Sequence, residues 1–226
     1  MSELSLGVVG LGVMGRNLAL NALDAGVVVA GTDLRAESVA GFAELAGERA
    51  LATDDADAFL AALPEPRALL VMVPAGAPVD AVLGSLAPKL AAGDVLVDGG
   101  NSFFRDTERR QAEMTARGLH FVGMGVSGGE EGARRGPSMM PGGALDAYAR
   151  LAPVLERMAA KVDGEPCVAH VGEGAAGHYV KMVHNGIEYA LMQLLAEAYD
   201  LLTRGCGLDN DAIGALFERW NEGPLQ

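Results

Sequence analysis

The chain has 226 residues, of which 50% are hydrophobic and 21% are charged, which is the composition of a globular protein. At a net charge of −13 we expect no nucleic-acid partner, because phosphate backbones are bound by clustered basic residues. Two distant cysteines predict neither a disulfide framework nor a zinc site. With no apolar run of membrane-spanning length and no signal-peptide pattern, we expect a cytoplasmic protein without a membrane partner.

Short apolar runs alternate with helical patterns through the first part of the chain. Strands are predicted at 6–9, 27–30, 69–73, 95–97 and 120–126, and helices at 17–25, 37–48 and 79–90. Buried strands separated by helices predict an α/β fold with a doubly wound, mainly parallel sheet covered on both faces. The glycine-rich stretch 127–143, which contains Glu130 and Glu131, is predicted to include a solvated loop.

The last quarter of the chain has a different pattern. Residues 177–204 predict one helix of about seven turns, and residues 210–219 predict a short helix leading to Trp220. We therefore expect a dinucleotide-binding domain at 1–176 and the beginning of an all-α domain at 177–226. No capping element follows Trp220, so we expect the second domain to be incomplete or to depend on a partner.

A glycine motif, GLGVMG, directly follows the first predicted strand and precedes a helix. In a Rossmann-type fold Gly10 allows the tight turn, Gly12 lets the backbone approach a pyrophosphate, and Gly15 lets the helix pack on the strand. The alternative is a glycine-rich turn that binds nothing, but Asp33 at the end of the second strand favours dinucleotide binding. The predicted cofactor contacts are Gly10, Leu11, Gly12, Val13, Met14, Gly15, Asp33, Leu34, Arg35, Val73, Pro74, Ala75 and Asn101.

The residues after the second strand bear on the choice of cofactor. A carboxylate at Asp33 accepts hydrogen bonds from a ribose diol and repels a 2′-phosphate, which favours NAD. Arg35 acts in the opposite sense, because its guanidinium can pair with that phosphate, although it can equally be a solvated loop residue. We expect NAD in preference to NADP.

One stripe of the long helix carries five polar side chains. At 100° per residue it contains Lys181, His184, Asn185, Glu188 and Tyr189. Lys181 and Glu188 are two turns, or about 10 Å, apart along the helix axis, so one can act as base and the other as acid on a small molecule between them. A desolvated lysine with a lowered pKa can serve as the base near neutral pH. The alternative is a structural ion network. The opposite side is predicted to be the core contact, and it holds Val183, Ile187, Ala190, Leu191 and Leu194.

Two strand ends offer further binding groups. Ser127, Gly128 and Gly129 predict a cradle of amides for an anion or carboxylate, with a mobile glycine loop as the alternative. Asn101 follows another strand and can hydrogen-bond a ligand at the carboxyl edge of the sheet. No HxxxH pair or carboxylate cluster suggests a metal site, so we expect metal-free chemistry.

Four segments together resemble the longer-form 6-phosphogluconate dehydrogenase family, and the likeness covers nearly the whole chain. They are GLGVMGRNLALN, VDGGNSFFRDTERR, FVGMGVSGGEEGARRGPSMMPGG and GHYVKMVHNGIEY. The resemblance implies oxidative decarboxylation of 6-phosphogluconate to ribulose 5-phosphate and CO₂ in the pentose phosphate pathway and gluconate utilisation. It also implies a homodimer at full length.

The same resemblance implies roles for individual residues. Neutral Lys181 would take the proton from the C3 hydroxyl and later polarise the ketone, and Glu188 would protonate C1 of the enediol. Tyr189 would contact the substrate phosphate. The remaining substrate contacts would be Asn101, Ser127, Gly128, Gly129, His184 and Asn185.

The chain departs from the family pattern in two places. Asp33-Leu34-Arg35 stands where many NADP-using members carry Asn-Arg-Ser/Thr, which again favours NAD. The chain is also about half the length of longer-form members, so the basic residues that complete their phosphate site are not in it. A nucleotide-binding fragment without turnover therefore remains an alternative. A sibling 3-hydroxyacid dehydrogenase is another, although the residues around Lys181 argue against it.

Overall fold

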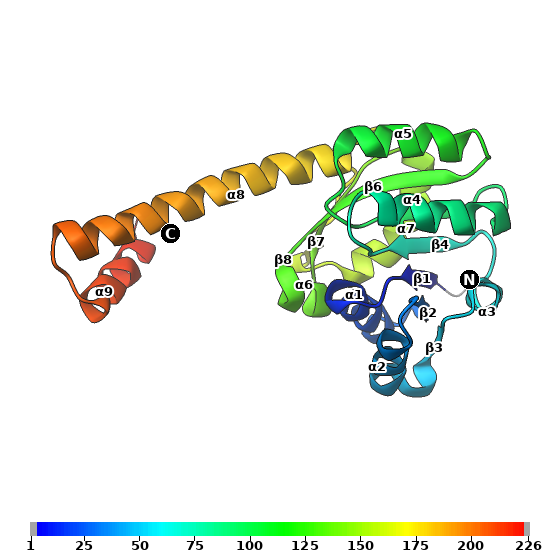
Figure 1. Ribbon diagram of the computed structural model, residues 1–226, viewed down its shortest axis with the longest axis horizontal. Helices are drawn as coiled ribbons and strands as arrows, with labels where there is room; N and C mark the ends of the chain where they lie inside the picture. The colour runs from blue at the N-terminus through cyan, green and yellow to red at the C-terminus, as the bar shows by residue number, and fades with distance from the viewer. Residues whose placement is uncertain (1–3, 224–226) are drawn as a thin grey trace. The chain divides into compact units, whose positions relative to one another are not determined.

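A computed structural model of the chain describes residues 4–223. Its main feature is a seven-stranded sheet in the order β3-β2-β1-β4-β5-β6-β7, in which the first six strands are parallel and β7 runs antiparallel to β6 (Figure 1). The predicted Rossmann-type α/β fold is confirmed. The strands are β1 Ser5–Val9, β2 Val28–Thr32, β3 Ala50–Thr53, β4 Ala68–Val71, β5 Val95–Asp98, β6 His120–Ser127 and β7 Ser138–Pro141.

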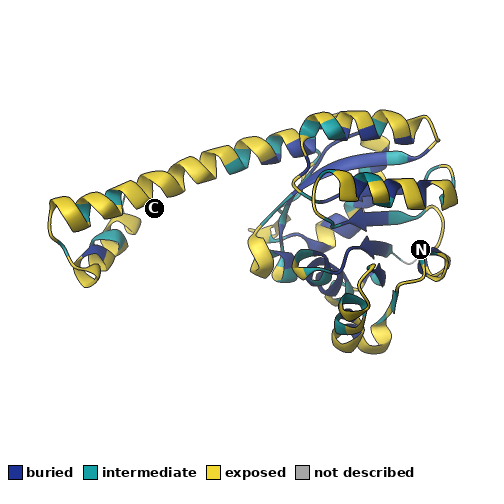
Figure 2. Cartoon of the chain, viewed as in Figure 1, coloured by how far each residue is buried: buried dark blue, intermediate teal, exposed yellow. Residues whose placement is uncertain are grey.

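Helices cover both faces of this sheet. One apolar core lies beneath α1, α2, α6 and α7, and a second lies beneath α3, α4 and α5. Because both faces are covered, the central strands β1, β4 and β5 are largely buried, which Figure 2 shows as dark blue arrows, and most of their residues are apolar. These helices are α1 Val13–Asp24, α2 Ala36–Ala46, α3 Ala56–Ala61, α4 Ala77–Leu86, α5 Phe104–Thr115, α6 Gly129–Arg135 and α7 Leu145–Met158, and a small hairpin pairs β8 Lys161–Val162 with β9 Glu165–Pro166.

The prediction of a loop around Glu130 and Glu131 is wrong. These residues form the first turn of α6, and Arg134 and Arg135 form its last turn. Acidic residues near a helix N-terminus and basic residues near its C-terminus favour a helix because they complement its dipole. Gly128, with φ of +128°, allows the chain to turn directly from β6 into this helix.

The chain divides into two compact units between Met182 and Val183, inside the helix α8 (Ala176–Asp200). The second unit contains the rest of α8, a π-helical turn at Leu201–Gly205 and α9 (Asn210–Asn221). Tyr199 donates its hydroxyl hydrogen to Asn210 Oδ1 at 2.8 Å, which links α8 to the start of α9. No helix in residues 4–223 is both long and apolar enough to cross a membrane.

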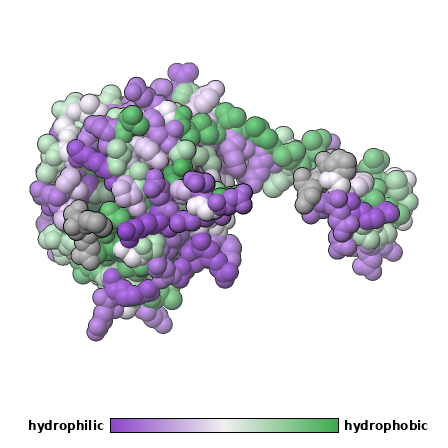
Figure 3. All heavy atoms as spheres, turned by 180° about the vertical axis from the view of Figure 1, so that it is seen from behind, coloured by the Kyte–Doolittle hydropathy of each residue, from purple (hydrophilic) through white to green (hydrophobic). Residues whose placement is uncertain are grey.

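The predicted core contact along α8 is also wrong. Its apolar residues are exposed, with Ile187 at 59%, Leu191 at 57% and Leu194 at 62% of their full accessible area. Most of α8 is yellow in Figure 2, and green hydrophobic residues lie along the same segment in Figure 3. The pattern correctly indicates an apolar face, but the described residues of the second unit do not cover it.

The first turns of α8 rest on the backbone of the sheet. A side chain at Gly177 would collide with backbone atoms of Gly123, Met140 and Gly142. A Cβ on Gly125 would lie 2.6 Å from Lys181 Cβ. Glycine at these positions is therefore what lets α8 approach β6 closely enough to place Lys181 against it.

We expect Gly177→Ala to lower the stability of the protein by about 3 kcal/mol, because a methyl group there overpacks a contact made of backbone atoms. Gly186→Ala is the matched control on the same helix, because no atom lies within 4 Å of a Cβ at that position. The control should be neutral or gain up to about 1 kcal/mol from helix propensity. Urea unfolding followed by circular dichroism measures both, and equal stabilities of the two variants would contradict the backbone contact.

Candidate functional site

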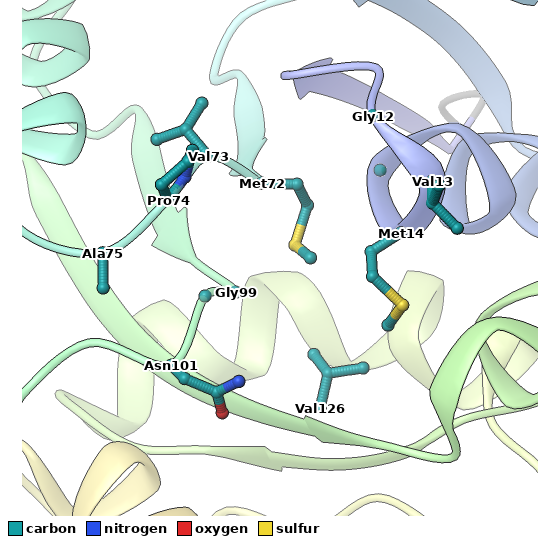
Figure 4. Close-up of a pocket in the computed structure, with 12 residues that line it drawn as sticks. Gly12, Val13, Met14, Met72, Val73, Pro74, Ala75, Gly99, Asn101 and Val126 are labelled. Atoms are coloured by element: carbon teal, nitrogen blue, oxygen red, sulfur yellow. The ribbon is translucent and has the colours of Figure 1, made fainter.

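A cavity of about 390 Å³ in the first unit lies at the carboxyl ends of β1, β4, β5 and β6. In Figure 4 the side chains of Met14, Met72 and Asn101 extend toward the space between the surrounding loops. This is where parallel sheets bind ligands, because the strand order reverses between β1 and β4. The lining residues are Gly12, Val13, Met14, Gly15, Met72, Val73, Pro74, Ala75, Gly99, Gly100, Asn101 and Val126.

The glycine loop forms the first wall of the cavity. Gly10 has φ of +94° and donates its amide hydrogen to Thr32 O at 2.8 Å, which fixes the turn after β1. Gly12 is the N-cap of α1 and provides no side-chain cap, so the first amides of the helix are left to a ligand. Gly15 passes so close to the Gly10 carbonyl that a side chain would collide with it. Gly10 and Gly15 thus have the structural roles that the motif predicts, a tight turn and a close approach of helix and strand.

Asp33 and Arg35 lie together beside the glycine loop. Asp33 Oδ2 accepts a hydrogen bond from the Leu11 amide at 2.7 Å, and Oδ1 accepts one from the Arg35 amide at 2.9 Å. Arg35 Nε is 3.3 Å from Oδ1, and Arg35 Nη2 would be 3.7 Å from a Cβ on Gly12. Burial alone would raise the pKa of Asp33, but these hydrogen bonds outweigh it and lower the pKa. The carboxylate is therefore ionised at neutral pH, and the arginine turns toward it.

One buried guanidinium holds the other two walls. Arg110 on α5 has no exposed side-chain area; its Nη2 donates to Gly76 O at 2.9 Å and its Nε to Asp80 Oδ1 at 2.8 Å. On its other side Nη1 is 3.3 Å from Ser102 Oγ and 3.5 Å from Asp98 Oδ2. Gly76 directly follows the lining residue Ala75. Asp98 and Ser102 flank the lining residues 99–101.

Carboxylates complete this buried network. Hydrogen bonding from Arg110 lowers the pKa of Asp80 to about 2, so the Asp80 carboxylate is charged at neutral pH. Asp98 is fully buried; its Oδ1 accepts from the Gly100 amide at 3.1 Å and its Oδ2 from the Ser102 hydroxyl at 2.6 Å. The loop that carries Asn101 is therefore held by hydrogen bonds at both ends.

Lys181 belongs to the same unit as the cavity. Its side chain is buried, at 7% exposure, and packs on Gly125 of β6, next to the lining residue Val126. Ser127 ends β6, and Gly128 and Gly129 begin α6 with positive φ angles. The structure thus packs Lys181 of α8 against β6, the strand that continues into the Ser-Gly-Gly segment.

The other predicted residues on α8 lie in the second unit. His184 Nδ1 is 3.6 Å from Glu188 Oε2 and 3.2 Å from Asn185 Oδ1, so these three side chains are neighbours on one side of the helix, as predicted. Glu188 and Tyr189 are exposed, at 56% of the side chain and 69% of the residue. The exposed contact between His184 and Glu188 contributes little to stability. The contact alone is also no evidence that either residue takes part in catalysis.

The sequence prediction finds most of the cavity but not all of it. Leu11 is buried below the loop, and Leu34 points into solvent at 99% exposure, so neither lines the cavity. The prediction omits Met72, Gly99, Gly100 and Val126, although all but Gly99 adjoin a predicted residue, and Gly99 is two positions from Asn101. Arg110 is also missed, because nothing in its helical sequence signals that it is buried. Residues 4–223 contain no group of three or more His, Cys, Asp or Glu that could hold a metal ion.

Comparison with known proteins agrees with this geometry. A family model described as the NAD binding domain of 6-phosphogluconate dehydrogenase matches residues 5–172, and one described as the 6-phosphogluconate dehydrogenase C-terminal domain matches residues 177–226. The decarboxylating 6-phosphogluconate dehydrogenase of Lactococcus lactis subsp. lactis is 52% identical over the whole chain, and the NADP(+)-dependent enzyme of Bacillus subtilis is 47% identical. The chain covers 48% of each, and so spans about half the length of these curated relatives.

A solved structure supports the same assignment. The 6-phosphogluconate dehydrogenase of Plasmodium falciparum, described in apo form and with NADP+ or 6-phosphogluconate, superposes with a TM-score of 0.92 at 36% identity. The match covers 97% of this chain and 48% of that one. The fold, the glycine loop and the matched segments lead to one conclusion: the chain belongs to the 6-phosphogluconate dehydrogenase family.

Proposed function

We propose that the protein carries out the oxidative decarboxylation of 6-phosphogluconate to ribulose 5-phosphate and CO₂, with a nicotinamide dinucleotide as oxidant. The observation that carries the proposal is the placement of buried Lys181 on Gly125 of β6, the strand whose next residue, Val126, lines a dinucleotide-type cavity. A domain division after residue 176, a cytoplasmic location and a homodimer belong to the same proposal and rest on the sequence.

The residues of the cavity fit a dinucleotide. The pyrophosphate would lie at the uncapped N-terminus of α1, where Gly12 leaves room for its oxygens. Asp33 would accept hydrogen bonds from the adenosine ribose, and the cavity walls at Val73–Ala75 and Asn101 would enclose the nicotinamide end. When bound, the cofactor supplies the hydride acceptor.

Lys181 and Glu188 would carry the proton transfers. In its neutral form Lys181 takes the proton of the C3 hydroxyl as hydride leaves C3, and the resulting ammonium then polarises the C3 ketone. Loss of CO₂ from the β-keto acid leaves an enediol, and Glu188 donates a proton to its C1. Asn101, the Ser127–Gly129 segment, His184 and Asn185 would hold hydroxyls and the carboxylate, and Tyr189 would contact the phosphate.

The proposal also includes a preference for NAD over NADP. Asp33 is ionised and half-buried beside the glycine loop, where a 2′-phosphate would meet its charge. Arg35 is already paired with Asp33, which lowers its power to attract that phosphate. Leu34 stands where many NADP-using members carry an arginine, and it has no charge to offer.

Lys181→Met should lower turnover about a thousandfold or more, because the variant keeps the side-chain volume and loses the proton acceptor. The assay follows reduced nicotinamide absorbance with 6-phosphogluconate, run separately with NAD and with NADP. Turnover that survives in Lys181→Met would exclude lysine as the base.

Glu188→Ala should lower turnover about a hundredfold in the same assay, since it removes the acid that protonates C1. Glu197→Ala is its matched control, an exposed glutamate on the same helix that contacts Gln193 at 3.1 Å, and should leave the rate unchanged. A folded, NAD-binding chain without any turnover would contradict the proposed activity for these 226 residues and favour a nucleotide-binding role.

Asp33→Asn should weaken NAD binding about tenfold and improve the affinity for NADP relative to NAD, because it removes the charge that accepts the ribose hydroxyls and repels the 2′-phosphate. Calorimetric titration with each cofactor measures the change without requiring turnover. Asp57→Asn, which alters an aspartate with 77% side-chain exposure on α3, is the control. Tighter binding of NADP than of NAD by the unmodified chain would overturn the preference.

A further inference from the structure

His178 is a buried titratable group that the proposed reaction does not use. It lies one turn before Lys181 on α8 and is only 2% exposed. Its Nδ1 is 2.6 Å from the hydroxyl of Thr107, a fully buried residue of α5. A Cβ on Gly123 would lie 2.6 Å from Thr107 Cγ2 and 2.8 Å from His178 Nδ1, so both side chains rest on the backbone of β6.

The imidazole is neutral at physiological pH. Burial lowers its pKa; the charge of Asp98 and the backbone of Asp98 and Gly100 oppose this only in part, and Arg110 adds to the lowering. A neutral ring has one donor and one acceptor nitrogen. The Thr107 hydroxyl lies 2.6 Å from Nδ1 and 3.4 Å from Phe103 O, so its main contact is with the ring, and the tautomer decides which of the two donates. Nε2 is buried and has no hydrogen-bond partner among the described residues.

His178 and Lys181 share one side of α8 and one face of β6. They are three residues apart on the helix, and they pack on Gly123 and Gly125, which are two residues apart on the strand. The hydrogen bond to Thr107 therefore fixes the rotation of this helical turn relative to α5. Arg110, one turn further along α5, holds the loop that carries Asn101 through hydrogen bonds of its own.

We propose that His178, through its hydrogen bond to Thr107, is a positioning residue that holds Lys181 in place against β6 for proton transfer. The inference rests on the proposed function, since it gives His178 a role only in a reaction that uses Lys181. It predicts different effects on catalysis and on cofactor binding. Loss of His178 should slow the chemical step, whereas cofactor affinity should be kept because Arg110 holds the cavity walls in place.

The test breaks the hydrogen bond from each side in the full 226-residue chain. Thr107→Val removes the hydroxyl with little change of volume, Thr107→Ser keeps a hydroxyl, and His178→Phe keeps a ring. We expect Thr107→Val and His178→Phe each to lower kcat about 10- to 100-fold, the effect of a misplaced catalytic group. Cofactor Kd should stay within about twofold, Thr107→Ser should behave like the unmodified chain, and the double variant should be no worse than either single one.

A second readout does not depend on turnover. The chain has three lysines, so competitive acetylation quantified by mass spectrometry compares Lys181 with Lys89 and Lys161 as internal references. The two disruptive variants should change the relative labelling of Lys181 about threefold or more, because a small displacement alters the solvation of its amine. If His178→Phe does not fold, Thr107→Val carries the comparison.

The outcomes separate the two proposals. Absence of turnover in the unmodified chain contradicts the proposed function, and the labelling of Lys181 then decides the role of His178 alone. Unchanged labelling in both disruptive variants overturns the positioning role. A cofactor Kd that weakens in step with kcat also overturns it, since His178 would then support the cavity walls rather than Lys181. A kcat of Thr107→Ser that falls as far as that of Thr107→Val overturns the positioning role as well.

Discussion

The buried guanidinium of Arg110 is the constraint on which the candidate site depends most. This one group hydrogen-bonds to two loops that follow different strands, through Gly76 O on one side and Ser102 on the other. A buried charge is costly unless it is paired, so the loops and the carboxylates of Asp80 and Asp98 are also what make its burial tolerable. The loops that form the cavity walls and the buried hydrogen-bond network of Arg110 therefore stabilise each other.

Close approach of backbones is the second organising principle of the first unit. The turn at Gly10–Gly15 brings a helix onto a strand at one side of the cavity, and Gly123, Gly125 and Gly177 bring another helix onto β6 at the other. In both places the absence of a side chain sets the distance. The first contact places the uncapped N-terminus of α1 next to β1. The second places buried Lys181 against β6 of the same sheet.

Much of this was predictable from the sequence, and the omissions have physical reasons. The glycine motif and the apolar strands can be recognised in the sequence, because tight turns and fully covered strands require those residue types. The helix α5 is harder to recognise, since its sequence is strongly polar while Thr107 and Arg110 are fully buried. Burial of α8 was overpredicted because an apolar stripe indicates that a face is suited to a partner, not that the described chain contains one.

The packing of α8 on β6 also limits which substitutions this family can accept during evolution. Where side chains pack against side chains, a second mutation can compensate for the first. At Gly177 the neighbouring atoms are carbonyl oxygens and an amide of the main chain, which no substitution elsewhere can shorten or reshape. Such a position is expected to diverge last among related sequences, whereas the packing around Gly186 on the same helix sets no such limit.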